Sequence, residues 1–154
     1  MPEKKRLLIV YHSQSGNTEK LAQAVLQGAR GVAETDTHIK RAFDATVDDL
    51  LACQGLLLGT PENFGYMSGA LKDFFDRTYH PSEGKLAGLP YAVFISAGND
   101  GTGAVREIAR IATGYGWRPA AEPVIVHNQI TPDALATCRD LGEAMATAIA
   151  IGIV

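Results

Sequence analysis

Six residues near the start of the chain have the composition of a phosphate-binding loop: Ser13, Gln14, Ser15, Gly16, Asn17 and Thr18. They follow an apolar run at residues 7–10, and a helical pattern begins directly after them. Free backbone N–H groups at a helix N-terminus attract an anion, and the helix dipole adds to that attraction. The three hydroxyl side chains add donors, and Gly16 lets the backbone approach a ligand closely. Because the loop has no Lys or Arg, we expect a phosphate held by dipoles and hydrogen bonds alone.

The spacing of this first loop (residues 13–18) excludes two common nucleotide motifs. It is not a Walker A loop, because no Gly-Lys-Ser/Thr follows the glycine, and it lacks the G-x-G-x-x-G of a dinucleotide site. An ordinary strand–helix turn with Ser15 or Asn17 as N-cap remains the alternative to a phosphate site.

Two more loops combine glycine with short polar residues. The second loop (residues 60–69) offers Pro61, Glu62, Asn63, Phe64 and Gly65, and the third loop (residues 96–103) offers Ala97, Gly98, Asn99 and Gly103. Aromatic faces and backbone donors of this kind suit a planar heterocycle. Phe64 tucked beneath its loop as a core residue is the alternative for that side chain.

The elements that position these loops alternate along the chain. Apolar runs predict strands at residues 6–11, 35–42, 55–60, 90–96 and 121–127. Helical periodicity predicts helices at residues 17–30, 46–52, 69–79, 102–115 and 132–149. Strict alternation predicts right-handed crossovers and a parallel sheet covered on both faces. The three loops then meet at the carboxyl edge of the sheet, where open α/β sheets bind their ligands.

Composition narrows the class of protein. The chain has 154 residues and a formal net charge of −3, and we expect one domain over residues 1–154. No basic patch indicates nucleic acid, and no apolar run is long enough to span a bilayer, so we expect a cytoplasmic protein. Cys53 and Cys138 have no metal-ligand spacing and are expected to be small buried side chains without a disulfide.

The second loop and the helix after it resemble a known family. Thr60-Pro61, Phe64-Gly65, Gly69, Lys72 and Phe74 stand where flavodoxin-like NAD(P)H-dependent FMN oxidoreductases have matching residues. The similarity is greatest to the quinone reductases once described as tryptophan-repressor-binding proteins. The resemblance implies an α/β, flavodoxin-like three-layer sandwich. Its five-stranded parallel sheet would have the order 2-1-3-4-5, with helices on both faces.

The resemblance also implies a function. FMN would be the cofactor and NAD(P)H the electron donor, with a quinone or similar small molecule as acceptor and a redox protein as a further partner. The first loop would hold the phosphate, the second would contact the isoalloxazine ring and ribityl chain, and the third would flank the other side. No side chain acts as an essential catalytic group, because the chemistry is centred on the flavin. We expect no metal, and a homodimer remains open.

The sequence departs from the quinone reductases in places, which leaves alternative functions open. Glu62-Asn63 stands where the quinone reductases often carry Arg, which questions the quinone substrate. A flavodoxin-type electron carrier with bound FMN is the main alternative, although such carriers are strongly acidic, and a flavin-free interaction domain is a third. We expect the Glu62 carboxylate to face solvent. His12, His80 and His127 are expected to have surface or capping roles rather than to donate protons.

Overall fold

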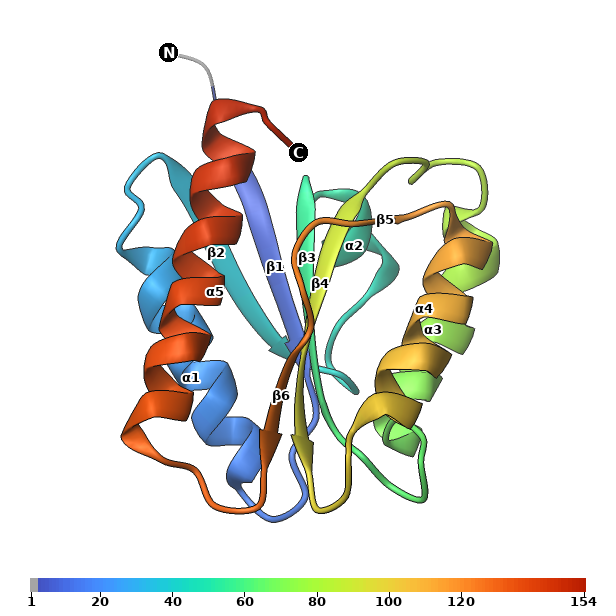
Figure 1. Ribbon diagram of the computed structural model, residues 1–154. Helices are drawn as coiled ribbons and strands as arrows, with labels where there is room; N and C mark the ends of the chain where they lie inside the picture. Colours follow the sequence, from blue (N-terminus) through green and yellow to red (C-terminus); the bar gives the residue numbers. More distant parts are fainter. Residues whose placement is uncertain (1–2) are drawn as a thin grey trace.

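The apolar runs of the chain form one parallel sheet in the computed structural model, which describes residues 3–154 (Figure 1). Its strands are β1 (Lys5–Tyr11), β2 (Thr35–Arg41), β3 (Gly55–Pro61), β4 (Pro90–Ala97), β5 (Arg118–Pro119) and β6 (Val124–His127). The order is β2-β1-β3-β4-β5, and β6 also pairs with β4. Every pairing is parallel. The predicted fold and strand order are confirmed.

The last predicted strand is the one place where the expected sheet is wrong. Residues 121–127 were expected to form a single strand, but β5 and β6 pair separately with the two ends of β4. Pro119 and Pro123 explain the break, because neither residue has an N–H group to donate to the sheet. The strand that continues to the carboxyl edge is therefore only β6.

Helices cover both faces of the sheet. They are α1 (Asn17–Arg30), α2 (Val47–Leu51), α3 (Gly69–Ser82), α4 (Thr102–Tyr115) and α5 (Pro132–Ile151). Figure 1 shows α1 and α5 on one face and α2, α3 and α4 on the other. Thr131 caps α5 by accepting a hydrogen bond from the Ala134 amide at 3.1 Å, and Pro132 occupies the first helical position. No helix within residues 3–154 is both long enough and apolar enough to cross a membrane.

The core lies in two layers, one on each face of the sheet. Leu8 and Val10 of β1 pack under α2, α3 and α4, whereas Leu7 and Ile9 pack under α1 and α5. All four side chains are at most 1% exposed. An unbroken apolar strand is therefore explained by burial on both sides.

Two glycines let α1 and α5 pack backbone against backbone. A Cβ at Gly28 would lie 1.9 Å from the Arg139 carbonyl oxygen, and one at Gly142 would lie 2.0 Å from the Val25 carbonyl oxygen. The contact is reciprocal, so neither position has room for a side chain. This packing fixes α1, and with it the first loop, against the C-terminal helix.

Both cysteines are buried and unpaired, as predicted. Burial raises the pKa of the Cys53 thiol to about 12 and that of Cys138 to about 11. Tyr115 is buried as well, and its hydroxyl donates to the Phe75 carbonyl at 2.6 Å. These groups serve packing and lie away from the three loops.

Candidate functional site

The three loops meet at the carboxyl edge of the sheet, at the bottom of Figure 1. They enclose a cavity of about 330 Å³, which is at the small end of the range for ligand pockets. The residues that line it are Gln14, Ser15, Asn17, Pro61, Glu62, Asn63, Ser96, Ala97, Gly98 and Asn128. Residues far apart in the sequence are thus brought together where the parallel strands end.

Eight of the fifteen predicted site residues line this cavity: Gln14, Ser15, Asn17, Pro61, Glu62, Asn63, Ala97 and Gly98. The other seven do not: Ser13, Gly16, Thr18, Phe64, Gly65, Asn99 and Gly103. Most of these seven shape the loops instead. Their role in ligand contact stays a prediction.

The first loop is organised by Ser13. Its Oγ accepts hydrogen bonds from the amides of Gly16 and Glu19, both at 3.1 Å. Gly16 is the N-cap of α1 with φ +98°, so neither Ser15 nor Asn17 caps the helix as the alternative expected. The amides of Asn17 and Thr18 have no acceptor among residues 3–154. They are the free donors that an anion needs.

Thr18 is only 1% exposed, so a ligand could reach it over only a small part of its surface. The role of its hydroxyl as a donor to the ligand stays a prediction. The space around Gly16 is open, since a Cβ there would meet nothing within 4 Å.

The second loop is a tight hairpin. The Asn63 amide donates to the Tyr66 carbonyl at 2.8 Å, and the Tyr66 amide donates back to Asn63 at 3.0 Å. Phe64 and Gly65 between them both have positive φ, 53° and 72°, as in a type I′ turn. Phe64 is fully exposed at the tip, so its alternative as a buried core residue is wrong.

Two side chains tie this hairpin to the rest of the edge. Buried Thr60 accepts a hydrogen bond from the Ser68 amide at 2.9 Å and donates to the Pro61 carbonyl at 2.8 Å. The Asn63 amide group donates to the Gln14 side-chain oxygen at 2.9 Å, which joins the first and second loops. The cavity therefore has a hydrogen-bonded wall before any ligand arrives.

Glu62 joins the second loop to the third. Its Oε1 accepts a hydrogen bond from the Gly101 amide at 3.2 Å, and its own amide donates to the Ser96 carbonyl at 2.9 Å. Its Oε2 is buried and has no hydrogen-bond partner. The carboxylate therefore turns inward, and our expectation that it faces solvent is wrong. The reason is Gly101, the N-cap of α4, whose free amide attracts a carboxylate.

The second loop also rests directly on α4. A Cβ at Gly103 would lie 2.1 Å from the Gly65 carbonyl oxygen. Gly103 therefore supports the second loop, and its contact with a ligand stays a prediction. The close approach needs a residue without a side chain at this position.

The N-termini of α1 and α4, both at this edge, differ in how they are used. The N-terminus of α4 is occupied by Glu62, whereas the amides of Asn17 and Thr18 leave α1 open to an anion. None of the residues that line the cavity is Lys, Arg or His. The nearby Arg41 is bonded to Glu19 at 3.1 Å. The backbone amides at the start of α1 are therefore free to accept an anion, and the predicted phosphate position stays a prediction.

The three histidines do not line the cavity. Burial, and then the charge of Arg41, lowers the pKa of His12, whose ring lies edge-on to Phe43 at 6.2 Å. His127 Nε2 lies 3.2 Å from the Asp100 carbonyl, and His80 packs against a neighbouring tyrosine on α3. His80 and His127 are exposed, as expected of surface residues, whereas His12 is partly buried and its Nδ1 has no hydrogen-bond partner.

Sequence reasoning missed two lining residues, Ser96 and Asn128. Asn128 follows β6, has φ 60°, and donates its amide to the Ala97 carbonyl at 2.8 Å. An asparagine directly after a strand, at a position that tolerates positive φ, was the available signal. Placing the end of β6 beside β4 was the step that required the structure.

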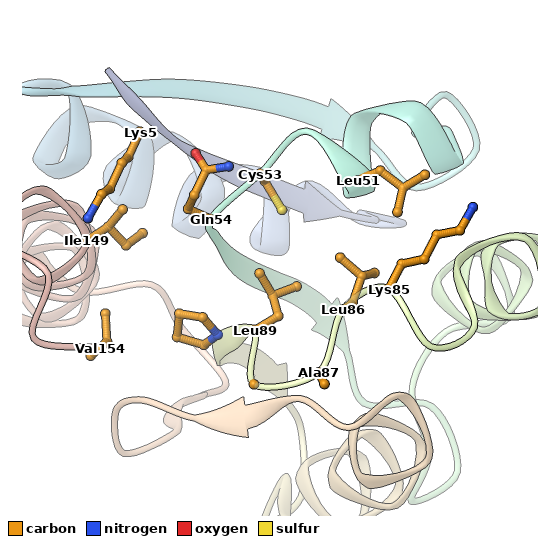
Figure 2. A pocket seen from close by; sticks show the side chains of 12 residues that line it. Lys5, Leu51, Cys53, Gln54, Lys85, Leu86, Ala87, Leu89, Ile149 and Val154 are labelled. Carbon is orange, nitrogen blue, oxygen red and sulfur yellow. The ribbon is translucent and has the colours of Figure 1, made fainter. Parts of the chain in front are cut away.

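A second cavity of similar size, about 340 Å³, lies at the opposite edge of the sheet (Figure 2). Lys5 and Lys85 stand at opposite ends of it, and Leu86, Leu89 and Ile149 form much of its wall. The polar groups do not converge on one point. Within the described part of the chain, no three His, Cys, Asp or Glu side chains are grouped to hold a metal ion.

Fold and site together define a flavodoxin-like α/β protein with free backbone amides in the loop after its first strand. The sequence pattern of NADPH-dependent FMN reductases matches residues 32–130. The chain belongs to this family of flavodoxin-like oxidoreductases.

The relatives include a protein named a flavodoxin and a protein named a quinone dehydrogenase. A flavodoxin from Aquifex aeolicus (strain VF5) is 36% identical over 98 residues, which is 64% of this chain and 53% of that protein. An NAD(P)H dehydrogenase (quinone) from Acidithiobacillus ferrooxidans (strain ATCC 53993 / BNL-5-31) is 34% identical over 112 residues, covering 59% and 56%. The chain thus spans about half the length of these curated relatives. The solved structure of a flavodoxin from the domain Archaea has a TM-score of 0.81 at 25% identity, covering 94% of this chain and 98% of that one.

Proposed function

We propose that this protein binds FMN at the carboxyl edge and transfers electrons from NAD(P)H to a small acceptor such as a quinone. One observation carries the proposal: the N-terminus of α1 presents free amides, without a cation, to a cavity enclosed by three loops. That arrangement suits a phosphate monoester attached to a larger polar and planar ligand. Family membership and the quinone-reductase relative support the same reading.

Within this proposal, different residues contact different parts of FMN. The amides of Asn17 and Thr18 would hold the phosphate, and the Ser13 hydroxyl keeps its own proton to donate. The ring and ribityl chain would lie between Pro61–Asn63 on one side and Ala97–Gly98 on the other. Asn128 would add a side-chain amide from the end of β6.

When bound, FMN would supply the electron-transfer chemistry. The protein's own residues bind, orient and shield. Thr60 and Glu62 hold the second loop in place, while the hydrogen bond between Asn63 and Gln14 closes the gap to the first loop. No titratable side chain other than Glu62 lines the cavity, so proton exchange with a second substrate would rely on solvent.

An electron carrier of the flavodoxin type is the second candidate. The Aquifex aeolicus relative is named a flavodoxin, and the archaeal flavodoxin covers almost the whole chain. The exposed Phe64 at the tip of the second loop would suit docking to a redox protein. The modest net charge of −3 argues against strong electrostatic steering to such a partner.

Anaerobic spectroscopy separates the two candidates. Purified protein is mixed with FMN, passed through a desalting column, and then treated with NADPH, NADH and a soluble quinone in turn. Rapid bleaching by a nicotinamide and recovery with the quinone are the expected results. Bound FMN that stays oxidised with both nucleotides but yields to dithionite would favour the carrier. Failure to retain FMN would overturn both.

The choice between NADPH and NADH, a homodimer, a single domain over residues 1–154 and a cytoplasmic location all stay predictions. The anaerobic additions of NADPH and NADH decide which nucleotide is the donor. Light scattering of the FMN-loaded protein measures its oligomeric state.

A further inference from the structure

Glu62 is the single charged residue among those that line the cavity. Its carboxylate has one hydrogen bond, from the Gly101 amide, and within residues 3–154 it has no salt bridge. Its second oxygen, Oε2, is buried and has no hydrogen-bond partner. A carboxylate without a counterion, one of whose oxygens is withdrawn from water, is less screened than an exposed one. Its field therefore acts on whatever occupies the cavity.

We propose that Glu62 is a positioning residue that fixes the second loop to the third and makes the site hold oxidised FMN more tightly than reduced FMN. This inference rests on the proposed function. It extends that function by assigning the redox bias of the site to one side chain. The bias makes the bound, reduced cofactor a stronger reductant, which suits onward transfer to an acceptor.

The preference for oxidised over reduced FMN follows from the charge balance of the reaction. Hydride transfer from NADPH to FMN moves two electrons and one proton, so FMN gains one negative charge while the nicotinamide loses one. A fixed carboxylate beside the site repels the extra charge and so weakens binding of reduced FMN. Removing that carboxylate raises the reduction potential of bound FMN.

Glu62→Gln isolates the charge from the loop contact. Glutamine keeps a side-chain oxygen that can accept from the Gly101 amide, but it carries no charge. Asp100→Asn is the matched control, because Asp100 lies in the third loop and loses the same charge, yet its carboxylate is exposed and bonds Thr102 instead. Glu62→Ala removes both charge and contact, so its difference from Glu62→Gln reports what the loop contact contributes.

The experiment measures the dissociation constants of oxidised and reduced FMN for each variant, and the midpoint potential against a reference dye. We expect Glu62→Gln to tighten reduced FMN relative to oxidised FMN by about tenfold, which corresponds to a rise of about 30 mV for a two-electron couple. Asp100→Asn is expected to leave the potential unchanged. Thermal unfolding of each apoprotein confirms that the variants are folded.

Two results would overturn the inference. One is a potential for Glu62→Gln equal to that of the wild type, and the other is an equal shift in Asp100→Asn, which would indicate a general charge effect. Both leave the proposed function standing. Failure of the wild-type protein to bind FMN in either oxidation state would overturn the proposed function itself, and with it this inference.

Discussion

Gly103→Ala tests whether the second loop rests on α4. The added Cβ would lie 2.1 Å from the Gly65 carbonyl oxygen, 2.7 Å from the carbonyl carbon and 2.9 Å from Cα. All three are backbone atoms, so no side-chain rotation relieves the clash. Ordinary contact begins at 3.4 Å, and the second loop must therefore withdraw by more than 1 Å.

Two opposing contributions set the expected change in the free energy of unfolding. Overpacking costs about 1–3 kcal/mol, whereas alanine is favoured over glycine in a helix by at most about 1 kcal/mol. We expect the free energy of unfolding to fall by roughly 0–2 kcal/mol, the difference between these two terms. A displacement of about 1 Å at a binding site is costly for function, so FMN affinity should fall by about tenfold or more.

Gly114→Ala is the matched control, because it lies in the same helix and its new Cβ would meet nothing within 4 Å. Urea unfolding gives the stability of each variant, and quenching of FMN fluorescence on titration gives the affinity. Gly114→Ala should be as stable as the wild type or more so, with unchanged affinity. A Gly103→Ala protein that matches Gly114→Ala in both measurements would show that the second loop is not seated on α4.

Three further outcomes are expected. Thr60→Val leaves the buried Ser68 amide without its acceptor, so urea unfolding should show a loss of about 1–3 kcal/mol, and an unchanged midpoint would contradict this contact. Ser13→Ala removes the acceptor of the Gly16 and Glu19 amides and should cost about 1 kcal/mol in thermal unfolding while weakening FMN binding; tight binding would show that the first loop needs no such support. Because burial raises the pKa of Cys53 to about 12 and of Cys138 to about 11, both are neutral thiols at pH 7. A thiol reagent should therefore label them only after unfolding, and rapid labelling of the native protein would refute their burial.

Most of the fold could be predicted from the sequence because the pattern of apolar residues is unambiguous. The run at Leu7–Val10 is apolar at every position, and only a strand covered on both faces buries all four side chains. The helix at 102–115 was predicted with its observed bounds, because its apolar stripe repeats at helical spacing and glycines flank it at both ends. The split of the last strand was missed because proline removes a donor without altering the apolar pattern.

The candidate site, like the fold, could be predicted from the sequence only in part. The amino-acid types of the first loop are enough to predict an anion position, since free amides and small residues before a helix are local properties of the chain. Sequence by itself likewise placed the three loops at one edge, because parallel strands end together. Tertiary structure alone decided that Glu62 turns inward to the Gly101 amide, that Gly103 supports the second loop, and that Asn128 joins the cavity. Each of these depends on a distance between segments far apart in the chain, and such distances are set by how the strands and helices pack.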